Sequence, residues 1–214
     1  MDLGLKGLKA VVTGGTNGIG RAIAQTLAAE GAHVAFCARH ADEVAQTVKD
    51  FAGHGVKISG RAVNVGDGPA LAAWVNDVAS EFGGIDLVVA NVSALAIAAD
   101  EAAWQRGFEV DMMGTVRLVN AAMPHLKRSA KASIVTISSV SGREIDFASG
   151  PYGTLSLIAC DQKVCTCRNE CRGMRYGGRG LEFEPAASSW VEADLQVRLS
   201  PDQLCSRELH NPFR

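Results

Sequence analysis

The segment from Thr13 to Gly20 has glycines at a spacing that can hold a phosphate. It reads Thr-Gly-Gly-Thr-Asn-Gly-Ile-Gly and directly follows a short apolar run. Glycines permit positive φ and a close approach of backbone to ligand. A helix beginning near Gly18 would present free N–H groups and its positive dipole end to a pyrophosphate. This context favours a dinucleotide site over a merely tight turn, with Gly14, Thr16, Asn17, Gly18, Ile19 and Gly20 as its binding residues.

A basic residue follows where a second contact to the nucleotide is expected. About 20 residues past the last glycine, an NAD site usually places an acid on the ribose hydroxyls. This chain has Arg39 there, in Cys-Ala-Arg-His. An arginine can bind a 2′-phosphate through a charge-assisted fork, whereas an acid would repel it. The sequence therefore favours NADP, with NAD as the alternative, since Arg39 could be a solvated charge and Asp42 and Glu43 lie nearby.

Further polar residues follow the apolar runs that the sequence predicts as strands. Asn64 and Val65 end one run, Asn91 follows the next, and Ser139 follows a third, thirteen residues before Tyr152. Ligands of open α/β sheets bind at the carboxyl ends of the strands. We therefore expect Asn64, Val65 and Asn91 to face the cofactor.

The elements that must position these residues alternate strictly between apolar runs and helical periods. Continuous apolar strands with amphipathic helices between them predict a parallel sheet covered on both faces, and right-handed crossovers make it doubly wound. The expected strands are Lys9–Thr13, His33–Ala38, a segment within Val56–Val65, Ile85–Ala90 and Ser133–Ser138; the expected helices are Arg21–Glu30, Ala41–Phe51, one opening at Gly66–Pro69, and about Phe108–Leu126. The predicted fold class is α/β, a Rossmann-like doubly wound sheet that is incomplete at its C-terminal side.

Over about 155 of its 214 residues the chain resembles the classical short-chain dehydrogenases/reductases. Their cofactor loop reads Thr-Gly-x3-Gly-x-Gly, as here; their Asp-Val and Asn-Asn-Ala-Gly segments correspond in part to Asn64-Val65 and to Asn91 with Ser93. The resemblance implies reversible NADP(H)-dependent reduction of a ketone to an alcohol, in the manner of 3-oxoacyl-acyl-carrier-protein reductases. It also implies that Ser139 binds the substrate carbonyl and that Tyr152 transfers a proton, because the developing oxyanion needs a donor and a proton.

Two positions depart from the pattern of that family. The lysine expected four residues after Tyr152 is Ser156, and the asparagine of the long helix corresponds to Asp111. A phenol ordinarily has a pKa near ~10, so proton transfer at neutral pH depends on nearby positive charge. Lys163 is roughly 16 Å along a helix and cannot substitute. We therefore predict at most trace reductase activity, and the alternative is an inactive nucleotide-binding remnant.

Composition limits the partners. The formal net charge is -2, with 47% hydrophobic and 21% charged residues, which is typical of a globular protein and argues against nucleic-acid binding through bulk basicity. No run approaches the ~18–20 apolar residues of a membrane span, and the N-terminus lacks a secretory pattern. We expect a cytoplasmic enzyme with a small-molecule carbonyl or alcohol substrate and, from the resemblance, a homotetramer or homodimer.

Residues 156–214 differ from the Rossmann domain expected at 1–155. Five of the six cysteines lie after Leu155, and the alternation of strands and helices is lost there. A zinc module would need a more usual ligand spacing, so no metal site is predicted, and a disulfide-linked appendage conflicts with a cytoplasmic body. The hypothesis that we favour is a shift of the coding frame, or a gene joined or spliced, just after Leu155.

Overall fold

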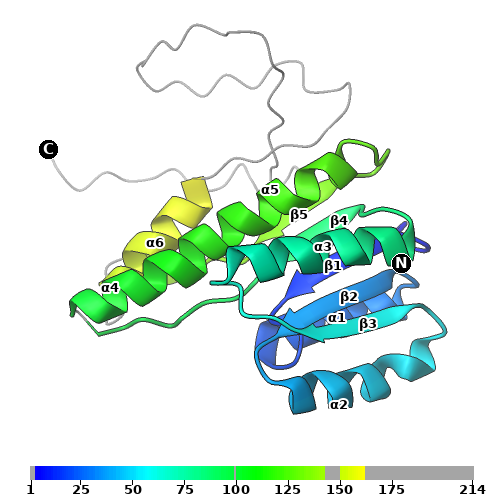
Figure 1. Cartoon of the computed structure of the whole chain (residues 1–214), viewed down its shortest axis with the longest axis horizontal. Helices are drawn as coiled ribbons and strands as arrows, with labels where there is room; N and C mark the ends of the chain where they lie inside the picture. The colour runs from blue at the N-terminus through cyan, green and yellow to red at the C-terminus, as the bar shows by residue number, and fades with distance from the viewer. Residues whose placement is uncertain (1–2, 99, 143–149, 162–214) are drawn as a thin grey trace, which may run out of the picture.

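The structure is a computed structural model, which describes residues 3–98, 100–142 and 150–161. Its centre is a five-stranded parallel sheet in the order β3-β2-β1-β4-β5 (Figure 1). The strands are β1 (Lys9–Thr13), β2 (His33–Ala38), β3 (Ile58–Ala62), β4 (Leu87–Ala90) and β5 (Ser133–Thr136). The predicted doubly wound sheet is confirmed.

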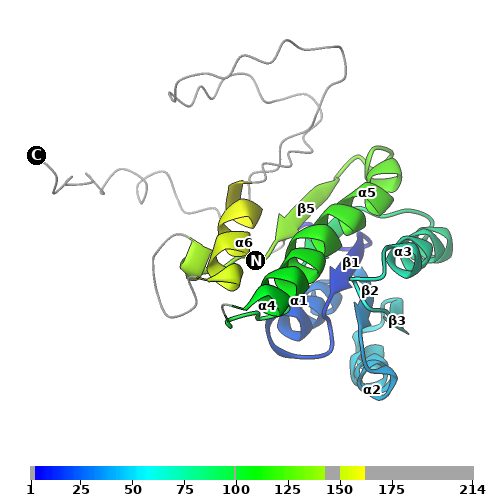
Figure 2. The same ribbon diagram turned by 60° about the vertical axis from the view of Figure 1, so that its left-hand side comes forward.

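Helices follow the strands in alternation. They are α1 (Gly18–Ala29), α2 (Ala41–Phe51), α3 (Gly68–Phe82), α4 (Glu101–Gly107), α5 (Gly114–Leu126) and α6 (Pro151–Asp161), with short turns at η1 (Ala52–His54) and η3 (Val140–Gly142) and a π-helical segment, η2 (Phe108–Met113). Helices α3 and α5 cover one face of the sheet, and α1 and α2 cover the other (Figure 2).

The core has two layers because successive strand residues point to opposite faces. In β1, Val11 packs with α3 and α5, in a cluster that holds Trp74 and Leu118. Its neighbour Val12 packs with α1 and α2, in a cluster that holds Phe51. Both layers are fully buried, so the sheet is a rigid platform whose strand ends position the loops above it.

Some strands and helices have the predicted bounds, and others begin or end at different residues. Strands β1 and β2 and helix α2 have the predicted bounds, and β3 lies within the predicted segment, whereas β4 and β5 are shorter than predicted. The helix expected from Phe108 begins at Glu101, because the Asp100 side chain accepts a hydrogen bond from Ala103 N at 2.7 Å and caps it there. Helix α6 continues past Leu155 to Asp161, so the predicted domain boundary falls inside this helix.

The tail beyond Asp161, with Lys163 and four of its five cysteines, lies outside the described residues. Within the described ranges, no group of three or more His, Cys, Asp or Glu side chains is arranged to hold a metal ion. None of the helices in those ranges combines the length and the apolar character that crossing a membrane requires.

Candidate functional site

A cavity of about 760 Å³ opens at the carboxyl ends of the strands. Its volume is in the range that binds cofactors and other small molecules. Seven of the ten predicted cofactor residues line it: Gly14, Thr16, Asn17, Arg39, Asn64, Val65 and Asn91. Gly18, Ile19 and Gly20 lie instead in the first turn of α1, next to the cavity wall. The predicted residues thus come together from the ends of four different elements.

The turn between β1 and α1 requires its glycines. Gly14 has a φ of +73°, and a Cβ there would lie 2.9 Å from Asn91 Nδ2. A Cβ on Gly20 would overlap the Gly14 carbonyl oxygen and the Asn91 amide. Gly18 has a φ of +53°, and a Cβ there would meet no described atom within 4 Å, so this position faces open space. The turn is therefore packed from behind and open in front, as a phosphate cradle must be.

Asn91 holds this turn in place from the end of β4. Its backbone N–H donates to Thr13 Oγ1 at 3.0 Å, and its side-chain amide donates to the Thr13 carbonyl at 3.1 Å. Thr13 in turn donates to the Val89 carbonyl at 3.4 Å. The predicted cofactor residue Asn91 therefore also fixes the shape of the cradle.

The first turn of α1 keeps its backbone donors available. Its N-cap residue, Asn17, makes no side-chain cap within the described residues. Instead, Asn17 Nδ2 donates to Glu43 Oε2 at 3.0 Å, and Thr16 Oγ1 donates to the same oxygen at 3.1 Å. The sequence marked Glu43 only as a nearby acid; its contact with the turn spans 26 residues and carries no local signal.

The cavity fits a dinucleotide better than it fits thiol chemistry. Cys37 lines it, but burial raises the pKa of the Cys37 thiol to about 12, against a smaller lowering by the Gly14 backbone N–H. The thiol is therefore protonated at neutral pH and is a poor nucleophile. An open glycine turn, a free helix N-terminus and two arginines, Arg39 and Arg106, remain as the groups that suit a phosphorylated ligand.

Asp111 lies beside the cavity and holds part of its wall. Its Oδ1 accepts a hydrogen bond from Ala94 N at 2.5 Å, and its Oδ2 accepts one from Ser93 Oγ at 2.9 Å. Burial raises the pKa of the Asp111 carboxyl, although both hydrogen bonds act in the opposite direction. Ser93 and Ala94 line the cavity, so Asp111 positions the loop after β4.

Ser139 and Tyr152 lie on neighbouring elements at the end of β5. Ser139 Oγ donates to Ser141 Oγ at 3.3 Å and accepts from Ser141 N at 3.2 Å. Tyr152 is half-buried in the first turn of α6, which packs against η3 and against the η2 segment that carries Asp111. Helix α6, which carries Tyr152, thus contacts both the turn after Ser139 and the segment of Asp111. None of the three predicted catalytic side chains is among those that line the cavity.

Ser156 stands one helical turn after Tyr152. It is 8% exposed, and its carbonyl accepts a hydrogen bond from Ser138 Oγ at 2.8 Å. The contact ties α6 to the end of β5. Residues at i and i+4 share a helix face, so a lysine at position 156 would place its charge on the same side of α6 as Tyr152.

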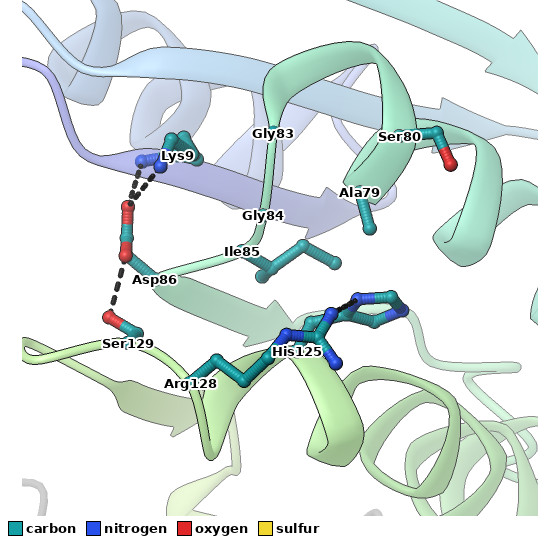
Figure 3. A pocket seen from close by; sticks show the side chains of 10 residues that line it. All are labelled: Lys9, Ala79, Ser80, Gly83, Gly84, Ile85, Asp86, His125, Arg128 and Ser129. Atoms are coloured by element: carbon teal, nitrogen blue, oxygen red, sulfur yellow. Dashed lines mark hydrogen bonds and ion pairs between the residues drawn. The ribbon is translucent and has the colours of Figure 1, made fainter.

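A smaller pocket of about 210 Å³ lies at the opposite, amino end of the sheet (Figure 3). Its charged groups bind one another. Asp86 accepts from Lys9 N at 2.9 Å and from Ser129 Oγ at 2.6 Å, with Lys9 Nζ at 3.9 Å. Arg128 contacts His125 Nδ1 at 2.9 Å. This pocket is a junction of β1, β4 and the loop after α5, and none of the predicted site residues lines it.

The fold agrees with the comparisons with known proteins. The sequence model of the family described as short chain dehydrogenase matches residues 8–156. The chain belongs to this family.

Individual relatives cover different lengths of the chain. Isoepoxydon dehydrogenase of Penicillium expansum is 37% identical over 149 residues, which are 67% of this chain and 57% of that protein. The chain spans little more than half the length of the curated relatives that it matches first. Cis-4-hydroxycyclohexanecarboxylate dehydrogenase of Sinomonas cyclohexanicum is 30% identical over 211 residues, with 95% and 81% coverage. This second alignment extends into the tail, whereas the family model ends at residue 156.

Solved structures share the fold. L-sorbose reductase from Gluconobacter frateurii, complexed with NADPH and L-sorbose, has a TM-score of 0.68 and 32% identity, over 74% of this chain and 62% of that one. A short chain dehydrogenase from Burkholderia cenocepacia J2315, in complex with NADP, has a TM-score of 0.68 and 28% identity, over 72% and 64%.

Proposed function

We propose that this chain binds NADP(H) in the cavity at the carboxyl end of the sheet and interconverts a ketone and a secondary alcohol. The observation that carries the proposal is the cavity itself, where residues from four strand ends surround an open glycine turn. Membership of the short chain dehydrogenase family supports it, as do the NADP and NADPH named with two structural neighbours.

Each cofactor residue has a role in this proposal. The first turn of α1, at Gly18, Ile19 and Gly20, holds the pyrophosphate, and Arg39 holds the 2′-phosphate. Asn64 and Val65, which follow β3 and line the cavity, would hold the adenine. Bound NADPH supplies a hydride to the carbonyl carbon of the substrate.

The catalytic roles fall on the elements next to this cavity. The Ser139 hydroxyl donates a hydrogen bond to the substrate carbonyl oxygen, and the Tyr152 hydroxyl gives that oxygen a proton. Asp111 positions the loop of Ser93 and Ala94, which lines the cavity. Ser156 supplies no positive charge on the Tyr152 face of α6, so we expect turnover well below the rate of about 1 per second that is ordinary for enzymes.

The substrate class follows from the relatives only as a proposal. A 3-oxoacyl thioester is favoured by the likeness to 3-oxoacyl-(acyl-carrier-protein) reductase FabG of Escherichia coli (strain K12), which is 28% identical over 210 residues. The Sinomonas relative, by its name, acts on a ring-borne secondary alcohol. A ketone panel should therefore contain both a 3-oxoacyl thioester and 4-oxocyclohexanecarboxylate.

The test is nucleotide binding by the full chain, followed by the ketone panel. We expect NADPH fluorescence to show saturable binding that is tighter than that of NADH, and Arg39→Ala to remove the preference. Slow consumption of NADPH that disappears in Tyr152→Phe would establish the reaction. Absence of binding by a folded chain would overturn the proposal.

A second candidate is nucleotide binding without turnover. The observation that favours it is Ser156, which stands where the family has its lysine. Saturable NADPH binding with no turnover of any ketone in the panel would select this candidate.

We also propose a homo-oligomer, dimer or tetramer. Trp104 and Phe108 are four residues apart on the continuous helical stretch of α4 and η2 and are 41% and 46% exposed. Large aromatic side chains that lie exposed together favour an interface. Light scattering of the wild-type chain and of Trp104→Lys should show the loss of the oligomer in the variant.

A further inference from the structure

Glu43 occupies an unusual position for an acid at the start of a helix. It is the third residue of α2, whose N-cap residue, His40, makes no side-chain cap within the described residues. An acid at this position commonly reaches back to the backbone N–H of the N-cap residue. Here the side chain extends across the cavity wall to the glycine turn of β1–α1 instead.

The contact uses both polar side chains that the turn offers. One oxygen, Glu43 Oε2, accepts from Thr16 Oγ1 at 3.1 Å and from Asn17 Nδ2 at 3.0 Å. Thr16 is 5% exposed, whereas Asn17 and Glu43 are exposed. All three residues line the cavity.

Arg39 lines the same cavity and stands four residues before Glu43. It takes part in no ion pair within the part of the chain that the structure describes. A 2′-phosphate bound by Arg39 would share the cavity with the Glu43 carboxylate, because both side chains line it. That carboxylate also already holds two donors, Thr16 and Asn17, which a phosphate could otherwise use.

We infer that Glu43 is a specificity-determining residue that acts against Arg39 and narrows the preference for NADPH over NADH. The inference rests on the proposed function, because it assumes that the cavity binds a nicotinamide nucleotide. The two cofactors differ only in the 2′-phosphate, which carries up to two negative charges. A fixed carboxylate beside it weakens NADPH binding more than NADH binding, because like charges repel.

Asp42 provides a matched control. It is the preceding residue in the same first turn of α2, it is exposed, and it does not line the cavity. Removal of either acid takes one negative charge from the helix N-terminus, so both variants change the helix dipole environment alike. Of the two acids, only Glu43 contacts Thr16 and Asn17.

The experiment is calorimetric titration of the full-length wild-type chain, Glu43→Gln and Asp42→Asn with NADPH, NADH, adenosine 2′,5′-bisphosphate and adenosine 5′-monophosphate. The two adenosine nucleotides isolate the 2′-phosphate from the nicotinamide half. In Glu43→Gln we expect the ratio of NADH to NADPH dissociation constants to rise about 5-fold or more, and the ratio for the adenosine pair to rise with it. In Asp42→Asn both ratios should stay within about 2-fold of wild type. The shift should shrink at 1 M KCl, because salt screens exposed charges.

Other outcomes overturn the inference. An equal loss of affinity for all four ligands in Glu43→Gln would mean that the residue only braces the turn. An unchanged ratio in a variant that melts like wild type would remove Glu43 from cofactor selection while leaving the proposed function intact. If the wild-type chain binds none of the four ligands, the proposed function fails, and the inference fails with it. Glu43→Ala serves as a second variant should Glu43→Gln not fold.

Discussion

Each end of the parallel sheet has a pocket lined by charged and polar side chains, and the two pockets differ in how these side chains are bonded. At the amino end, Lys9, Asp86 and Ser129 bind one another, and His125 and Arg128 do the same, around a pocket of about 210 Å³. At the carboxyl end, a cavity of about 760 Å³ is lined by residues from the ends of four elements.

The difference lies in which groups already have partners. An ion pair whose remaining lone pairs are also hydrogen-bonded has little left to offer a ligand, because a ligand would have to break those bonds first. At the carboxyl end, the glycine turn and the first turn of α1 leave backbone donors uncapped and space in front of Gly18. The pocket at the amino end is therefore a structural junction, whereas the cavity at the carboxyl end is the candidate ligand site.

The largest effect should come from adding one carbon to the cradle. In Gly20→Ala, the new Cβ overlaps the Gly14 carbonyl and the Asn91 amide, so the turn must open. Overpacking of this kind costs about 1–3 kcal/mol, and we expect NADPH affinity to fall about 10- to 100-fold in a fluorescence titration. Gly53→Ala is the control, because a Cβ there meets no described atom within 4 Å. NADPH binding by Gly20→Ala within about 2-fold of wild type would contradict the role assigned to this turn.

A charge placed beside Tyr152 should have the next largest effect. In Ser156→Lys, an ammonium group on the Tyr152 face of α6 favours the ionised phenol, and we expect kcat for ketone reduction to rise about 10-fold or more, within the usual range of general acid–base effects. Ser156→Met adds similar length without charge and should leave kcat near the wild-type value. Equal rates in the two variants would show that the charge is not what the site lacks.

At the amino end, we expect a loss of stability without a loss of cofactor. In Asp86→Asn, the amide cannot accept from Lys9 N and Ser129 Oγ as the carboxylate does, so the free energy of unfolding should fall by about 1–3 kcal/mol. NADPH affinity should stay unchanged. Asp77→Asn is the control, since its pair with Arg61 is 50% and 60% exposed and should contribute less than about 1 kcal/mol. A weaker NADPH affinity in Asp86→Asn would show that the contacts at the amino end of the sheet also affect ligand binding at its carboxyl end.

The smallest effect should be a dependence on pH at Asp111. Burial raises the pKa of this carboxyl in the folded chain, so the folded state binds its proton more tightly than the unfolded state does. The stabilisation from this proton is present at low pH and is lost as pH rises through the raised value. We expect Asp111→Asn to gain stability relative to wild type from pH 4 to pH 8, by about 1 kcal/mol or less, in thermal melts. A difference that shrinks with rising pH would reverse this assignment; Asp42→Asn should show no such trend.

Local sequence was enough to predict much of the fold. The bounds of β1, β2 and α2 match the prediction. Strands β1 and β2 are short, mainly apolar runs, and α2 is one amphipathic helical period between short breaks. The early start of the long helix was missed, because Asp100 caps a helix that begins at Glu101, seven residues before the predicted start at Phe108. The π-helical turn of η2 has no period in the sequence that would distinguish it from an α-helix.

The sequence could predict which residues line the candidate site, but it could not predict which of them contact one another. The glycine spacing predicted the shape of the turn between β1 and α1, since that turn needs glycine at Gly14 and Gly20. The bonds from Glu43 to Thr16 and Asn17, and from Asn91 to Thr13, join residues 26 to 78 positions apart. Nothing in the local pattern specifies such pairs.

The origin of the tail stays a prediction, to be tested by translating the gene in its other two frames beyond codon 155.

The strand order also determines which parts of the sheet can form first during folding. Strand β1 pairs with β2 about 24 residues later and with β4 about 77 residues later, and long loops close more slowly than short ones. During synthesis, β1, β2 and β3 can assemble while β4 is still absent. The glycine turn then waits for Asn91, whose amide holds it from the end of β4. A ribosome must therefore release more than 90 residues before the glycine turn can take its final shape.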